Sequence, residues 1–272
     1  MVNAPKAILF DLDDTILTEG DRLIILLLVA EKLAHRLVPY SPVAIAHALE
    51  NALEAFWSSP THSKTARLGS HIGIRQAREL VISNTLQKLN LPDTHVGPVF
   101  CDLFSQARTA SARMYDGARI TLETFRQMNV RLALVTNGAA DVQREKLERF
   151  NLTPLFDHVQ IEGEMGFGKP DEQTYLHAMK AMDVEPAGTW MVGDNLEWEV
   201  AAPQRLGIRA IWHDHRRRGL PPDCHVQPDH IILEWSELLP LICRPCQERR
   251  DDKTSPSRER NDKHPPGLSR RS

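Results

Sequence analysis

Short apolar runs recur along the chain, and stretches with the apolar spacing of helices separate them. The apolar runs predict buried strands, which cover residues 7–10, 130–135, 157–161, 188–193 and 208–212. The stretches between the later runs predict helices, which cover residues 118–128, 139–150, 172–182 and 197–206. Pro203 falls inside the last helix, so we expect that helix to start late or to kink. Alternating strands and helices are typical of an α/β fold, with helices on both faces of a parallel sheet.

The chain between the first two strands has a different pattern, with helical signals and no strand-like run. Asp21 can cap the first of four predicted helices, and Ser41 followed by Pro42 is typical of the start of the second. The first, third and fourth predicted helices cover residues 23–37, 71–90 and 95–112. Four successive helices predict a helical bundle that is inserted into the α/β unit.

These patterns divide the 272-residue chain into three parts. We expect an α/β core from residues 1–18 and 113–243, the inserted helical bundle from residues 19–112, and a charged tail from residues 244–272. The tail contains nine Lys and Arg residues, five Asp and Glu residues and almost no apolar residues. Such a segment cannot bury enough surface to offset the entropy of ordering, so the tail should be disordered.

Two aspartates follow the first predicted strand directly, in the sequence Asp11-Leu12-Asp13-Asp14-Thr15. Open α/β sheets bind ligands at the carboxyl ends of their strands, so both acids fall where a ligand would bind. Two like charges placed together are costly unless a cation lies between them, which favours a metal site. Acid pairs also occur by chance in loops, but three further polar segments strengthen the functional interpretation.

The further segments contribute a hydroxyl group, a lysine and another acid. Thr136-Asn137-Gly138 follows the second strand and suits a phosphate, although alone these residues are more often the cap of a helix. Lys169 lies in a glycine-rich loop, where a single lysine is more often simply solvated. Asp194 ends another apolar strand. Helix capping alone does not explain why four such segments all suit a phosphate or a divalent cation.

The order of these segments resembles that of the haloacid dehalogenase-like hydrolase superfamily. The four signature motifs stand in order as DxDDT, TNG, GKPD and VGDN, and the resemblance spans about residues 5–215. It implies a Rossmann-like core with a magnesium-dependent phosphotransfer site. It also implies that the helical bundle between the first two motifs caps this site.

By this resemblance, Asp11 is the nucleophile and Asp13 is the general acid and base. Thr136, Asn137 and Lys169 would bind the phosphoryl group. The chemistry fits, because a carboxylate can attack phosphorus to form an aspartyl-phosphate, which divides one hard hydrolysis into two easier steps. The second acid must protonate the leaving alcohol and later accept a proton from water, which requires a pKa above that of the nucleophile.

The resemblance also implies a Mg²⁺ site, and Mg²⁺ prefers oxygen ligands from one or two carboxylates, phosphate and water. We expect Asp11 and Asp194 to supply such oxygens, together with the backbone carbonyl of Asp13. The chain departs from the family pattern five residues after Asp194, where Glu199 replaces the usual aspartate. Glu199 could bind the metal directly, bind it through water, or pair with Lys169.

The predicted substrate is a small phosphorylated metabolite, such as a sugar phosphate, a nucleoside monophosphate or phosphoglycolate. A 2-haloacid dehalogenase-type hydrolase needs neither a metal nor a second acid, so Asp13 and Asp194 argue against it. A non-catalytic binding protein is disfavoured because every chemical position is occupied, and a mutase would need a cap that excludes water. Basic residues of the bundle are more often solvated, but some could face the site: Arg22, His35, Arg67, His71 and Arg75.

Composition narrows the class of partner. The net charge of −3 includes the basic tail, so the rest of the chain is more acidic, which argues against a nucleic-acid-binding surface. The longest apolar run, residues 23–30, is too short to span a bilayer, and residues 1–5 lead into the first strand without a signal-peptide pattern. We therefore expect a cytoplasmic enzyme that acts on a small molecule, while the oligomeric state has no sequence signal.

Overall fold

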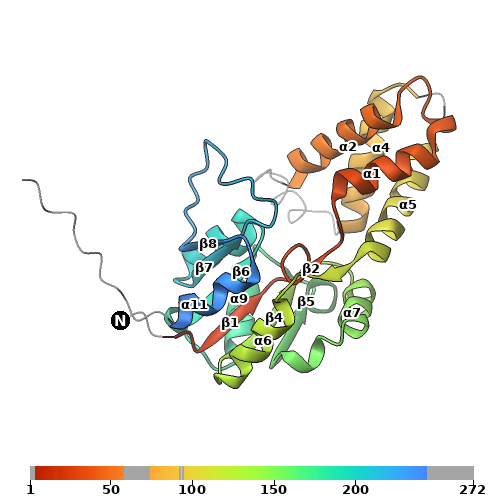
Figure 1. Ribbon diagram of the computed structural model, residues 1–272. Coiled ribbons are helices and arrows are strands. Elements are labelled where there is room, and N and C mark those ends of the chain that lie inside the picture. The colour runs from red at the N-terminus through yellow and green to blue at the C-terminus, as the bar shows by residue number, and fades with distance from the viewer. Residues whose placement is uncertain (1–3, 58–73, 92, 94, 244–272) are drawn as a thin grey trace, which may run out of the picture.

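The computed structural model describes residues 4–57, 74–91, 93 and 95–243. Within these residues, six parallel strands form one sheet in the order β5-β4-β1-β6-β7-β8 (Figure 1). The strands are β1 Ala7–Phe10, β4 Arg131–Thr136, β5 His158–Ile161, β6 Thr189–Gly193, β7 Arg209–His213 and β8 His230–Ile232. The Rossmann-like parallel sheet is confirmed, and β1 lies in its middle, between β4 and β6.

The sheet is covered on both faces by helices, and the side chains of β1 alternate between two hydrophobic clusters. The covering helices are α6 Ala118–Gln127, α7 Ala140–Arg149, α9 Glu172–Ala181, α10 Ala202–Arg205 and α11 Leu238–Cys243. Ile8 and Phe10 belong to a cluster with apolar residues of α6, α7 and α11. Ala7 and Leu9 belong to a cluster with residues of α9 and α10. A strand that is buried on both faces explains why its sequence is a continuous apolar run.

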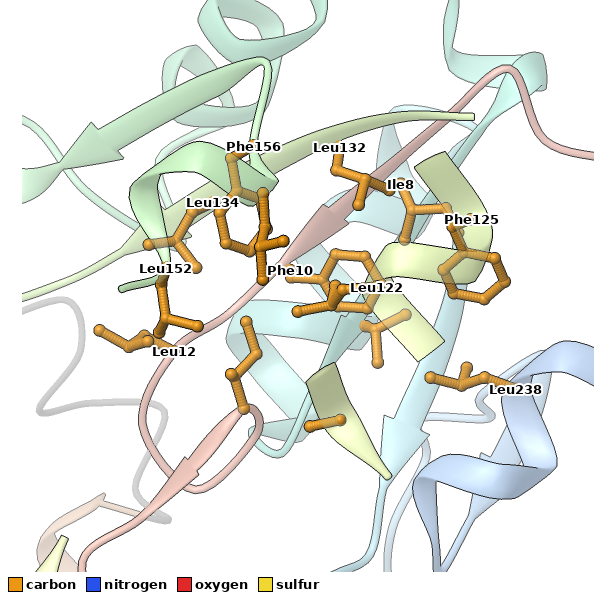
Figure 2. Packing of buried hydrophobic residues seen from close by; sticks show 14 of the residues in the cluster. Ile8, Phe10, Leu12, Leu122, Phe125, Leu132, Leu134, Leu152, Phe156 and Leu238 are labelled. Carbon is orange, nitrogen blue, oxygen red and sulfur yellow. The ribbon is translucent and has the colours of Figure 1, made fainter. Parts of the chain in front are cut away.

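The C-terminal part of the described chain packs back against the first strand. Trp235 stacks on Phe10 with ring centroids 5.5 Å apart, and its indole N–H donates to the carbonyl oxygen of Thr15 at 2.9 Å. Figure 2 shows Leu238 of α11 in the same group of side chains as Phe10 and Leu122. The sequence pattern does not predict this contact, because β8 has only three residues and α11 only six, too few for a clear periodic pattern.

Four described α-helices lie in the chain between Thr18 and Arg113, and they pack on one another around a hydrophobic cluster of their own. They are α1 Arg22–Lys32, α2 Pro42–Trp57, α4 Ile74–Lys88 and α5 Val96–Ser111. We refer to the described residues between 19 and 112 as the helical insertion. Figure 1 shows it to one side of the sheet. Two short antiparallel strands, β2 Leu17–Thr18 and β3 Arg113–Met114, pair where the chain leaves and re-enters the core.

The first helix of the insertion begins as expected but ends early. The carboxylate of Asp21 accepts a hydrogen bond from the backbone N–H of Ile24 at 3.0 Å, so Asp21 is the predicted cap. The prediction of one helix to Leu37 is wrong. The backbone of Leu33 leaves the helical conformation with φ of −101° and ψ of 12°, and a short 3₁₀ turn over Ala34–Arg36 follows. This change of direction buries Leu37 in the cluster of the insertion.

Pro203 interrupts the helix predicted over 197–206, as expected. A π-helical segment, Leu196–Ala201, precedes α10, and Pro203 lies in the first turn of α10, where no backbone N–H is needed. The start of the helix predicted over 71–90 and the tail at 244–272 lie outside the described residues. Among the residues that the structure describes, no helix has the length and apolar content needed to cross a membrane.

Candidate active site

The carboxyl end of β1 places Asp11 at the centre of the predicted site. The backbone N–H of Asp11 donates to the carbonyl oxygen of Val192 at 3.0 Å, so this residue still follows the sheet. Its side chain is buried and has two donors: Lys169 Nζ lies 2.5 Å from Oδ1, and Thr15 Oγ1 donates to Oδ2 at 3.1 Å. These contacts fix the orientation of the carboxylate.

Lys169 is buried and bridges two acids. Its Nζ lies 2.5 Å from the carboxylate of Asp11 and 2.7 Å from that of Glu199. Burial lowers the pKa of Lys169, but the two adjacent carboxylates outweigh this effect, so the net shift is upward and the lysine stays charged. Burial raises the pKa of Glu199 to about 7, with Lys169 acting in the opposite direction. Of the roles that the sequence left open for Glu199, the structure shows the pairing with Lys169.

A glycine at the end of β6 gives Glu199 room to reach Lys169. A Cβ atom on Gly193 would lie 2.0 Å from Cγ of Glu199, so any side chain at this position would displace the glutamate. The backbone N–H of Asn195 donates to Glu199 Oε2 at 2.8 Å. The side chain of Asn195 caps the π-helical segment by accepting from the N–H groups of Glu197 and Trp198. The glycine and asparagine of the VGDN motif therefore both shape the position of Glu199.

Thr136 and Asn137 follow β4 and lie beside Lys169 and α7. The side chain of Asn137 donates to the carbonyl oxygen of Lys169 at 2.8 Å and accepts from its backbone N–H at 2.9 Å, so it fixes the lysine loop. Thr136 is buried, and its hydroxyl oxygen accepts from Gln143 Nε2 at 2.7 Å. The alternative of a helix cap is wrong for these residues, because α7 has Ala139 at its cap and no side-chain cap bond.

Asp13 contacts a second lysine, Lys146, which the sequence did not single out. Lys146 Nζ lies 2.7 Å from Asp13 Oδ1, and Gln143 Nε2 donates to Oδ2 at 2.9 Å. Burial raises the pKa of Asp13, as do the charges of Glu19 and Asp11, and Lys146 only partly offsets this rise. The acid expected to donate a proton thus has a pKa above its usual range.

Glu19, the first residue of the helical insertion, contacts Lys146 of the core. Its carboxylate lies 2.6 Å from Lys146 Nζ and 2.6 Å from Nε of Arg108 on α5. Burial alone would raise the pKa of Glu19, but the two cations outweigh it and lower the pKa to about 2. Arg108 also approaches the Asp14 carboxylate at 3.9 Å. A continuous row of charged groups therefore connects Asp13 with the helical insertion.

Asp194 belongs to a group of possible metal ligands. One ligand atom from each of Asp14, Asp194 and His215 lies within 4.8 Å of the others. Burial, followed by the charges of Asp14 and Glu199, raises the pKa of Asp194 well above its usual value. Burial also lowers the pKa of His215, whose Nδ1 lies 2.7 Å from the Tyr115 hydroxyl. Clustered acids beside a neutral imidazole form a donor set that suits a divalent cation.

The contacts above link the predicted residues of all four motifs at one edge of the sheet. The residues that the sequence reasoning missed are Asp14, Glu19, Arg108, Gln143, Lys146 and His215. Of the basic residues of the insertion, Arg22 pairs with Glu50 and Glu54, and His35 is exposed. Arg67 and His71 lie outside the described residues, as does the side chain of Arg75.

Comparisons with known proteins identify the family and the fold. A profile of haloacid dehalogenase-like hydrolases matches residues 5–207. Phosphoserine phosphatase from Thermus thermophilus is 33% identical over 207 residues, which are 75% of this chain and 79% of that protein. Glyceraldehyde 3-phosphate phosphatase from Pyrococcus furiosus is 29% identical over 133 residues, which are 48% of this chain but only 55% of that protein. The magnesium-bound HAD-hydrolase YfnB from Bacillus subtilis has the same fold, with a TM-score of 0.67, 19% identity and coverage of 89% of this chain and 100% of that chain.

Proposed function

This chain belongs to the haloacid dehalogenase-like hydrolases, and from that premise we propose that it is a magnesium-dependent phosphatase of a small phosphorylated metabolite. One arrangement carries the proposal: the Asp11 carboxylate is held by Lys169 and Thr15, and a second acid of raised pKa, Asp13, lies two residues further on. Two relatives named for phosphoserine and glyceraldehyde 3-phosphate support a small substrate.

In the first step, an oxygen of Asp11 attacks phosphorus and forms a P–O bond, and the bond from phosphorus to the leaving oxygen breaks. The leaving oxygen keeps the bonding electron pair and takes the proton of Asp13. The raised pKa of Asp13 favours the protonated form that this step needs. Lys169 supplies positive charge beside Asp11, where the transferred phosphoryl group gains negative charge.

In the second step, water attacks the phosphorus of the aspartyl-phosphate. Asp13, now ionised, accepts a proton from that water, the P–O bond to Asp11 breaks, and inorganic phosphate leaves. Lys146, at 2.7 Å, stabilises the ionised form of Asp13 between the two steps. The two acids thereby return to their starting states.

The acids at this edge of the sheet fit a hard cation. Asp14, Asp194 and His215 present ligand atoms close together. The pKa of Asp194 is raised first by burial and then by neighbouring negative charges, which a cation would neutralise. We propose Asp11, Asp194 and the backbone carbonyl of Asp13 as the Mg²⁺ ligands, with Asp14 as a further oxygen donor. When bound, Mg²⁺ would neutralise charge on the transferred phosphoryl group.

The helical insertion is proposed to act as a cap, with residues 19–112 forming a unit beside the core of 1–18 and 113–243. Its separate hydrophobic cluster and the contact of Arg108 with Glu19 support this division. A unit in this place can cover the leaving group and exclude bulk water during the reaction. The motif residues all lie in the core, so the cap would select the substrate.

An assay of metal dependence with an aryl phosphate tests the proposal. The chelator-treated protein should lose its phosphatase activity and regain it when Mg²⁺ is added. A panel of sugar phosphates, nucleoside monophosphates and phosphoglycolate, ranked by kcat/KM, would then identify the substrate class. Halide release from a 2-haloacid that persists in chelator, without phosphatase activity, would overturn the proposal in favour of dehalogenase chemistry.

A further inference from the structure

Arg78 on α4 is a half-buried cation that the proposed mechanism does not use. Its guanidinium lies 3.4 Å from the Ser105 hydroxyl and 5.8 Å from the centroid of the Phe104 ring. Among the described residues, no carboxylate lies within ion-pair distance of it. Arg22 and Arg108 of the same insertion do pair with acids, at 2.6 Å in each case. Arg78 therefore differs from these arginines in having no anionic partner within the described residues.

The charged side chains near Arg78 form ion pairs with residues other than Arg78. Arg108 also lies 5.8 Å from the Phe104 centroid, and it pairs with Glu19, which Lys146 contacts as well. Burial lowers the pKa of Arg78, and the charge of Arg108 lowers it further, whereas Glu19 raises it. Arginine nevertheless stays charged in proteins. Among the described residues, Arg78 is thus a charged guanidinium without an ion-pair partner, close to the charged groups that reach Asp13.

The place of Arg78 indicates which end of a substrate it would meet. Lys146 contacts both Asp13 and Glu19, and Glu19 contacts Arg108, whose guanidinium shares the Phe104 ring with that of Arg78. In the proposed mechanism Asp13 protonates the leaving oxygen, so this row of contacts runs on the side of the leaving group. The phosphoryl group itself lies on the other side, with Asp11.

We propose that Arg78 binds a carboxylate of the leaving group, so that the substrate is the phosphate ester of a small hydroxy acid. The inference rests on the proposed phosphatase function. A guanidinium matches a carboxylate with two parallel N–H donors. One guanidinium without an ion-pair partner among the described residues suits one carboxylate, whereas a second phosphate group would bring about two negative charges.

Matched substrate pairs test this proposal directly. Phosphoserine differs from phosphoethanolamine by the carboxylate, and 3-phosphoglycerate differs from glycerol 3-phosphate by a carboxylate in place of a hydroxymethyl group. The value of kcat/KM is measured for each in the wild type, in Arg78→Gln and in Arg78→Lys. Lys88→Gln is the control, because it removes the same charge from an exposed position of the same helix.

The wild type should favour the carboxylate member of at least one pair by about tenfold or more. Arg78→Gln should lower kcat/KM for that member by about 10- to 100-fold, the usual effect of a lost charge-assisted hydrogen bond, and leave the other member within about threefold. Arg78→Lys should fall between, and Lys88→Gln should match the wild type. If Arg78→Gln folds poorly, kcat/KM falls by the same factor for both substrates of a pair. The ratio of the two kcat/KM values then still measures the preference for the carboxylate.

Binding to Asp11→Asn separates this inference from the proposed function. Calorimetry with Mg²⁺ present should show tighter binding of the carboxylate member even without turnover, and Arg78→Gln in that background should abolish the difference. Binding with that preference but no wild-type hydrolysis would refute the phosphatase and keep the carboxylate site. The proposal would be overturned if the wild type had equal kcat/KM for the two members of each pair. It would also be overturned if the preference for the carboxylate member persisted in Arg78→Gln. A preference confined to fructose 1,6-bisphosphate over fructose 6-phosphate would overturn it as well, because it would indicate a second phosphate.

Discussion

Lys169 and Lys146 make the same kind of contact on the two sides of the Asp11–Asp13 loop, in different surroundings. Lys169 lies 2.5 Å from Asp11 and 2.7 Å from Glu199, and only 1% of its side chain is exposed. Lys146 lies 2.7 Å from Asp13, whose side chain is 34% exposed. The proposed nucleophile is therefore enclosed, whereas the proposed general acid lies where a leaving group and water can reach it.

The number of cations per acid also differs between the two sides. Lys146 is shared with Glu19, which has Arg108 as a second cation, and the pKa of Glu19 falls to about 2. Asp13 has only its share of Lys146, so burial prevails and its pKa rises. Lys146 contacts both carboxylates, but only Glu19 has a second cation, so Glu19 stays ionised while the pKa of Asp13 remains high enough to favour a bound proton.

The largest expected effect is that of Asp11→Asn, which removes the proposed nucleophile and preserves its shape. We expect kcat to fall by more than about 10³-fold, because loss of a covalent nucleophile removes the reaction path itself. Steady-state kinetics, with circular dichroism to verify the fold, would measure this. Retention of more than about one hundredth of the wild-type kcat would show that the enclosed side does not supply the nucleophile.

Asp13→Asn should have the next largest effect, and the effect should depend on the substrate. Without a general acid, alkyl phosphates should lose about 10²- to 10⁴-fold in kcat, and aryl phosphates should lose less because their leaving groups need little protonation. The ratio of the two losses is the measurement. Equal losses would show that Asp13 acts through structure or metal binding and not through proton transfer.

The two lysines should differ in their effect on stability. Lys169→Met leaves two buried carboxylates without a cation and should lower the free energy of unfolding by about 3–5 kcal/mol. Lys146→Met should cost only about 1–2 kcal/mol, because Glu19 keeps Arg108 and Asp13 is partly exposed. Urea denaturation of both variants would measure the difference. Equal losses would remove the distinction between an enclosed side and an open side.

The effect of Glu19→Gln on stability should depend on pH. The pKa of Glu19 is about 2 in the folded chain and 4.5 ordinarily, so its ionised form stabilises the fold above pH 4.5 and this contribution is lost as the pH falls towards 2. The wild type should exceed the variant by on the order of 1–3 kcal/mol at neutral pH, with the gap narrowing below pH 4.5. Urea denaturation at several pH values would measure the gap. Glu148→Gln, at an exposed position of α7, is the control and should show no such trend. A gap that stays constant down to pH 3 would contradict the assignment.

The sequence predicted the enclosed side better than the open one. Asp11 and Asp194 end continuous apolar runs, and the carboxyl ends of neighbouring parallel strands necessarily meet at one edge of the sheet. The strand pattern therefore predicts that both acids lie at the same edge of the sheet, and the strand order of the folded sheet makes β1 and β6 neighbours. The sequence left several roles open for Glu199, because the pairing with Lys169 depends on the space beside Gly193, which only the folded backbone defines.

Apart from Asp13, the residues of the open side were not predicted, because its buried surface is formed by polar residues. In α7 the buried residues are Gln143, Lys146 and Leu147, so the apolar spacing that marks an inward face is nearly absent. Arg108 did carry a signal, since it continues the buried stripe of Phe100 and Phe104 along α5. A charged residue on an apolar stripe suggests a buried ion pair, although the sequence does not identify its partner.

The position of β1 has a consequence for the order in which the chain matures during synthesis. β1 is translated before β4 and β6, yet it lies between them in the sheet, and Phe10 pairs with Val192. At about 5–20 residues per second, a ribosome reaches Val192 roughly 10–40 s after Phe10. The loop that follows β1 gains another contact only after Trp235 has been translated, because the Trp235 indole N–H donates to the carbonyl oxygen of Thr15. The segment that carries the proposed nucleophile is thus translated before the strands on either side of it, and it gains its final neighbours only after much of the core has been made.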